Sequence, residues 1–164
     1  MANIDIYLEE GFASQGGLMD RLLGSDRLFS TGYELAAFAA GIGYKMVKEK
    51  NKPLRECHAT AQKNALTIKL STNAARADTF VTDLFAILEV KENIGSEGDQ
   101  DIVIESTLEA LKEDSFSKRC QMFNRYVHTG LHHISDTHNE QNLPYSEVVL
   151  RFALEGPFCF EPTA

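Results

Sequence analysis

The chain has 164 residues, of which 43% are hydrophobic and 24% charged, a composition typical of one globular domain with its own core. A formal net charge of −8 argues against a surface built mainly to bind nucleic acid phosphates. The three cysteines are widely spaced and form no CxxC pair, so the sequence encodes neither a disulfide framework nor a zinc knuckle. The N-terminus lacks a signal-peptide pattern and no apolar run approaches membrane length, so we expect a cytoplasmic protein without a membrane segment.

Two short segments of the chain have the pattern of half-buried strands. Residues 3–8 and 66–70 alternate between apolar and polar side chains. The two strands can pair with each other, because neither is long enough to be stable alone. Between them, residues 18–23 form an apolar helical turn that we expect to end at Gly24.

The stretch 28–50 predicts one long helix around which the rest of the chain is organised. Thr31 and Glu34 have the spacing of a capping box at its start. Small residues, including Gly41 and Gly43, keep its middle thin, which favours close approach of another backbone. Its apolar stripe consists of Leu35, Phe38, Ala39, Ile42 and Met46.

Four further segments show helical periodicity: 73–92, 101–112, 115–135 and 144–155, although the last would suit a strand nearly as well. We expect residues 136–143 to form a loop. The residues expected to face the core are Phe80, Val81, Leu84, Ile87 and Leu88; Ile104, Leu108 and Leu111; Cys120, Phe123, Val127, Leu131 and Ile134; and Val148, Val149 and Phe152.

These elements predict a mainly α fold with minor β structure, in a single domain over residues 1–164. We expect a compact arrangement of four to five helices with one or two short strands. The 28–50 and 115–135 helices carry the most regular stripes and small residues such as Gly130, so they are expected to touch.

His128 and His132 are the candidate metal ligands of the sequence. They lie four residues apart and therefore share one helix face, a spacing that zinc sites use. The pair lacks the intervening glutamate of an H-E-x-x-H motif, and the face opposite Val127 and Leu131 should be solvated. We therefore predict a surface histidine cluster and no bound metal.

The other candidate groups also lack a catalytic pattern. Cys57 and His58 are adjacent in sequence, which does not by itself bring a nucleophile and its base together in space. An acidic cluster lacks the spacing of a calcium loop: Glu97, Asp99, Asp101 and Glu105. There is no P-loop, G-x-S-x-G or dinucleotide fingerprint. We predict no catalytic residues, no cofactor and no enzymatic activity.

The order of strand, short helix and longer helix is similar to that of ribbon-helix-helix regulators, which read DNA with a paired strand. Such a strand needs hydrogen-bond donors facing the groove. Here the outward residues would be Asn3, Asp5, Tyr7 and Glu9, and the two carboxylates disfavour contact with phosphates. A DNA-binding regulator is therefore the alternative hypothesis, and direct nucleic acid binding is not expected.

The segment 143–160 is more apolar than a tail that is exposed to solvent. Two interpretations stay open: it is a final core element, or it is a surface for a protein partner. In the second case the interaction residues would be Val148, Val149, Phe152, Phe158 and Phe160.

Three stretches of the chain together resemble a known family. They are LFSTGYELAAFAAGIGYK followed by Lys52-Pro53-Leu54, the segment Asp83 to Leu88, and Phe123-Asn124-Arg125-Tyr126 with the later Gly130-Leu131. Over about residues 28–135 the chain resembles the Dnd system-associated protein 4 family of bacterial DNA phosphorothioation and restriction clusters. Residues 136–164 depart from this pattern and form a C-terminal extension.

The resemblance implies a role in anti-phage defence and supplies no catalytic residues. On this basis we expect an accessory interaction subunit whose protein partners are a larger ATPase, a nuclease or both, encoded at the same locus. The alternative is a transcriptional regulator of such a locus. Self-association into a homo-oligomer also remains possible.

Overall fold

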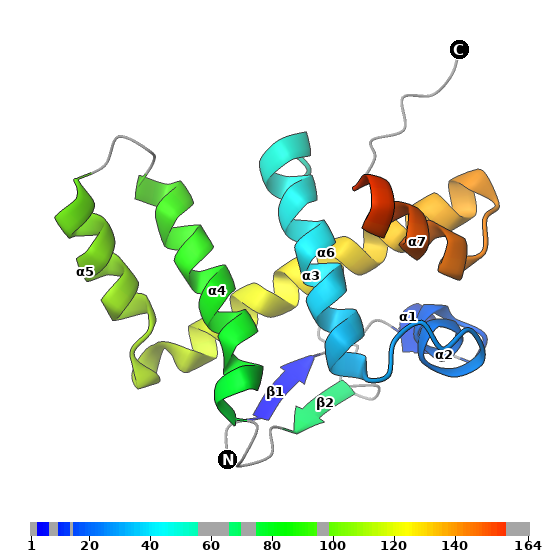
Figure 1. The fold of residues 1–164 in the computed structure, drawn as a ribbon, viewed down its shortest axis with the longest axis horizontal. Coiled ribbons are helices and arrows are strands. Elements are labelled where there is room, and N and C mark those ends of the chain that lie inside the picture. Colours follow the sequence, from blue (N-terminus) through cyan, green and yellow to red (C-terminus); the bar gives the residue numbers. More distant parts are fainter. Residues whose placement is uncertain are drawn as a thin grey trace. The chain divides into compact units, whose positions relative to one another are not determined.

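The computed structural model describes residues 3–6, 10–13, 15–55, 66–69, 75–94 and 99–156. The elements, in chain order (Figure 1), are β1 (Asn3–Ile6), α1 (Glu10–Ala13), α2 (Leu18–Asp20), η1 (Arg21–Ser25), α3 (Gly32–Lys50), β2 (Leu66–Lys69), α4 (Ala75–Ile94), α5 (Gln100–Ala110), η3 (Glu113–Ser115), α6 (Phe116–Gln141) and α7 (Tyr145–Glu155). The predicted class, mainly α with minor β, is confirmed. Both predicted strands are present, and β1 pairs with β2 in a two-stranded sheet.

The chain divides into two compact units, although each is discontinuous in sequence. Unit 1 contains Met1–Asp5 and Thr67–Phe123, and unit 2 contains Ile6–Leu66 and Asn124–Ala164. Helix α6 begins in unit 1 and continues into unit 2. The single domain over residues 1–164 therefore stays a prediction, and the two units are described separately.

Unit 2 is built on the crossing of α3 and α6, as the sequence predicted. A Cβ atom added to Gly43 would overlap the carbonyl oxygen of Tyr126, and one added to Gly130 would overlap that of Ala39. The backbones therefore touch at both points of the crossing. The stripe residues around it are buried, in particular Leu35, Ala39, Ile42, Met46, Val127, Leu131 and Ile134.

Helix α3 begins and ends at the residues that the sequence marks. Thr31 is the N-cap, and its hydroxyl oxygen accepts a hydrogen bond from the Glu34 N–H at 3.2 Å. In return the Glu34 carboxylate accepts from the N–H of Ser30 at 2.8 Å, one residue before the position that a standard capping box uses. Asn51 ends the helix in the left-handed conformation, with φ of 52°.

Two boundaries differ from the sequence predictions. Helix α6 does not end near Ser135 but continues to Gln141, because Thr137 is buried and contributes to the packing of unit 2. Asn142, with φ of 53°, follows its end. Gly24 was expected to follow the short helical turn, but it lies inside η1, a π-helical turn that continues α2.

The segment 144–155 is a helix, α7, and it packs against η1 in unit 2. Val148, Val149 and Phe152 are each less than 5% exposed. Leu18 and Leu22, from α2 and η1, are fully buried in the same unit. The C-terminal segment, as far as Gly156, is therefore a core element.

Unit 1 contains the hairpin of α4 and α5, which lie side by side in Figure 1. The core-facing side of α4 is not the predicted one. Thr82, Phe85 and Ala86 are buried, and Phe85 packs edge-on against Phe123 of α6 at a centroid distance of 5.7 Å. Leu84 and Ile87, which were expected in the core, are more than a third exposed.

Candidate functional site: the hairpin of α4 and α5

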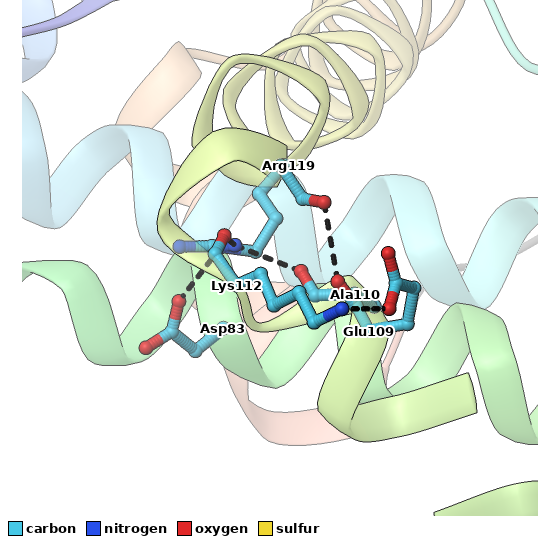
Figure 2. A network of polar contacts seen from close by, with 6 residues as sticks. Asp83, Glu109, Ala110, Lys112 and Arg119 are labelled. Carbon is cyan, nitrogen blue, oxygen red and sulfur yellow. Dashed lines mark hydrogen bonds and ion pairs between the residues drawn. The ribbon is translucent and has the colours of Figure 1, made fainter. Parts of the chain in front are cut away.

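The base of the hairpin is fixed by one buried arginine, Arg119 of α6 (Figure 2). Its Nε lies 3.0 Å from Oδ1 of Asp83 on α4. Its Nη1 donates to the carbonyl oxygens of Ala110 at 2.8 Å and Lys112 at 2.7 Å, just where α5 ends. Because the last carbonyls of a helix have no partner within it, this arginine caps α5 and ties it to both α4 and α6.

Further side chains hold both ends of α5. The Ser115 hydroxyl donates to the Glu109 carbonyl at 3.1 Å, and Lys112 forms an ion pair with the Glu109 carboxylate. The hydrogen bond from Lys112 to the Glu109 carboxylate, together with the charge of that carboxylate, raises the pKa of Lys112 above its ordinary value. At the other end Asp99 is the N-cap, and its carboxylate accepts from the Asp101 N–H at 3.0 Å. Helix α5 is therefore firmly positioned.

One side of the hairpin forms an open cleft of about 600 Å³ with α6. Its apolar floor includes Ala86 and Val90 of α4 and Met122 of α6. Charged groups of both signs surround this floor: Glu89, Glu105, Glu109, Lys118 and Arg119. No group of three or more metal-ligating side chains occurs in the described part of the chain.

The other side of the hairpin carries exposed apolar residues. Helix α5 has no buried residue, and Ile104 and Leu108 are 50% and 62% exposed. Both belong to the predicted inner stripe of this helix, so that prediction is wrong for them, whereas its third residue, Leu111, is half-buried. A second row, Val103, Thr107 and Ala110, is half-buried and takes the inner position instead. Ile102, at the start of the helix, is also exposed.

Helical spacing places Leu84, Ile104 and Leu108 opposite the cleft, and Ile87, three residues after Leu84, is its neighbour on the surface of α4. Leu84 is two positions from the cleft residue Ala86, and Ile104 and Leu108 are each two positions from the cleft residue Ser106. Two positions correspond to about half a turn of α-helix. We call this surface the outer face and define it by its four apolar residues, Leu84, Ile87, Ile104 and Leu108.

The hairpin carries most of the net negative charge of the protein. Residues 75–112 contain nine Asp and Glu residues and three Lys and Arg residues, a formal charge of −6 out of −8 for the chain. Within α5 there are Asp101, Glu105 and Glu109, spaced by four and therefore in one row, and no lysine or arginine. An acidic row thus runs beside the exposed Ile104 and Leu108.

The α6 histidines of unit 2 are buried or half-buried, which contradicts the predicted surface cluster. His128 is fully buried. His132 is half-buried, packs edge-on against Phe12, and its Nδ1 lies 3.3 Å from Nη1 of Arg55, which can only donate. His128 thus lies in the packed interior around α6, and His132 is partly covered by Phe12, so the two do not form the exposed cluster that the spacing suggested. The physical reason is that α6 has neighbours on more than one side.

The two remaining α6 histidines contact α7. His133 stacks on Phe152 with ring centroids 5.1 Å apart, and His138 stacks on Tyr145 at 3.8 Å. The Nδ1–H of His138 also donates to the Leu143 carbonyl at 2.5 Å. Both histidines therefore serve to pack α7 onto α6.

Several other predicted site residues have a definite place. Val148, Val149 and Phe152 lie in the core of unit 2, so their side chains are not available to a partner in this conformation. Cys120 is half-buried on α6. Phe158, Phe160, Cys57, His58, Glu97, Tyr7 and Glu9 lie outside the described residues.

Comparisons with protein-family models, with characterised proteins and with solved structures gave no match for this sequence. Over the residues that the structure describes, no helix is both long and apolar enough to cross a membrane.

The outer face was not predicted from the sequence, because a single apolar row was expected on each helix of the hairpin. A signal was present in α5, where Val103, Thr107 and Ala110 form a second row at helical spacing beside Ile104 and Leu108. A helix that has two such rows and packs against one neighbouring helix can bury only one row, so the other row is exposed.

Proposed function

We propose that this protein is a non-catalytic accessory subunit that acts by binding other proteins, in a prokaryotic anti-phage defence or DNA-modification complex. The observation that carries the binding role is α5, a helix that is capped at both ends and yet exposes Ile104 and Leu108. Contiguous exposed apolar residues on a rigid element are typical of an interface with a protein partner.

The biological setting rests on the family resemblance over residues 28–135. That resemblance supports a larger ATPase, a nuclease or both as the partners, and a cytoplasmic location. The DNA-binding alternative is less well supported, because the hairpin is strongly acidic and phosphate contacts require cations.

Co-purification of the untagged protein with the products of its neighbouring genes tests this proposal. We expect a complex of fixed stoichiometry in size-exclusion chromatography with light scattering. A protein that elutes alone from every such mixture would contradict the proposal. A mobility shift with its own promoter DNA at physiological salt would support the regulator instead.

A further inference from the structure

We propose that the outer face of the α4–α5 hairpin binds an amphipathic helix of a protein partner, and that lysine or arginine residues border the apolar stripe of that helix. This inference rests on the proposed function and specifies the surface and the chemistry of the partner.

The shape of the surface favours a helix. Leu84 and Ile87 form one short row on α4, and Ile104 and Leu108 form another on α5. Two neighbouring helices present a groove between such rows, and a partner helix fills it with residues spaced by three or four. Arg119 and Asp99 cap the two ends of α5, so the helix that carries one of these rows is held in place without the partner.

The charge of the surface favours a basic partner. Asp101 and Glu105 lie one turn apart on α5, beside the apolar row, and α5 contains no basic residue. Lys91, four residues after Ile87, is a cation on the α4 side. Cations of the partner are therefore expected along the α5 edge, where opposite charges raise the association rate and set the orientation.

The same charges disfavour the other occupants. If α5 of a second copy packed on this α5, the carboxylates of Asp101, Glu105 and Glu109 would approach their own counterparts, and like charges oppose such pairing. Nucleic acid is disfavoured for the same reason, because its phosphates would face this acidic row.

The test uses the full-length protein and two synthetic helical peptides. One has a leucine stripe bordered by lysines, and the other has glutamate in place of every lysine. Isothermal titration should show binding of the lysine peptide only, and the affinity should fall as NaCl is raised.

Variants then locate the binding surface. The double variant Ile104→Ser and Leu108→Ser should weaken binding by about tenfold or more. A few buried side chains supply most of the binding energy of such an interface, and this variant removes two of them. The matched control is Leu150→Ser with Leu154→Ser on α7, residues that are 50% and 84% exposed and should leave binding unchanged. Asp101→Lys with Glu105→Lys should also weaken binding. Circular dichroism verifies that each variant is folded.

Four outcomes would overturn the inference: neither peptide binds, the glutamate peptide binds as tightly, the α5 and α7 variants behave alike, or the protein forms a dimer that the α5 variant abolishes. The proposed function can survive these outcomes. A co-purified complex that persists in the Ile104→Ser, Leu108→Ser variant removes only the surface assignment, whereas the absence of any complex removes the proposed function itself.

Discussion

Gly130 on α6 and Ala39 on α3 are in direct backbone contact in unit 2. The carbonyl oxygen of Ala39 occupies the space that a Cβ atom on residue 130 would need. One turn further along α3, Gly43 meets the carbonyl group of Tyr126 in the same way. The two helices therefore cross at a separation that a side chain at either position would prevent.

This crossing predicts that replacing a glycine by alanine has opposite effects on stability at the crossing and away from it. Gly43→Ala and Gly130→Ala should each lower the free energy of unfolding by about 1–3 kcal/mol, the usual cost of overpacking. Gly41 is the matched control, since nothing lies within 4 Å of its Cβ position. Gly41→Ala should raise stability by up to about 1 kcal/mol through helix propensity. Urea unfolding measures both, and equal effects at Gly41 and Gly43 would contradict the crossing.

In unit 2, truncating a buried apolar side chain should cost much more stability than truncating an exposed one. Ile42 and Leu131 are 5% and 1% exposed, so replacing either by alanine should cost about 2–5 kcal/mol. Leu154→Ala on α7 should change stability by less than about 0.5 kcal/mol, because Leu154 is 84% exposed. Thermal unfolding distinguishes the two classes. A Leu131→Ala protein as stable as the Leu154→Ala protein would show that this stripe is not core.

The contacts of Arg119 in unit 1 predict that its replacement lowers the free energy of unfolding more than replacement of the exposed Arg151 does. Arg119→Ala should cost about 1–3 kcal/mol, because it removes the ion-pair partner of Asp83 and the hydrogen bonds that Arg119 donates to the Ala110 and Lys112 carbonyl oxygens. Arg151→Ala breaks only an exposed pair with Glu147 and should cost about 0.5 kcal/mol or less. Chemical unfolding of the two variants provides the comparison, and a similar loss in both would contradict the capping role of Arg119.

Removal of α7 tests its assignment as a core element. Truncation after Asn142 deletes Val148, Val149 and Phe152 and exposes the residues of unit 2 against which they pack. We expect loss of cooperative unfolding in the near-ultraviolet circular dichroism signal. A folded fragment that still forms the complex would show that α7 is neither core nor interface.

Helix α3 and its crossing with α6 were predictable from sequence because their signals are local. Thr31 and Glu34 cap the start of α3, Asn51 ends it, and the glycines allow the contact with α6. Each of these features depends on a few neighbouring residues, so no knowledge of the tertiary arrangement was needed.

The inward-facing side of α5 and the burial of the α6 histidines could not be predicted from local sequence. Whether Ile104 or Val103 faces inward depends on which side of α5 meets α4, and the periodicity of α5 alone fits both. His128 and His132 have metal-ligand spacing, but Phe12 and Arg55, which contact His132, are distant in sequence. The outer face, with its acidic border, was therefore visible only once the packing of α4 and α5 was known.

Amide hydrogen exchange of the protein, alone and within its co-purified complex, tests the central claim most directly. If the outer face is the binding surface, exchange in α5, residues Gln100–Ala110, should slow on complex formation, while exchange in α7, residues Tyr145–Glu155, should stay unchanged. Unchanged exchange in α5, together with slower exchange elsewhere in the chain, would contradict the account.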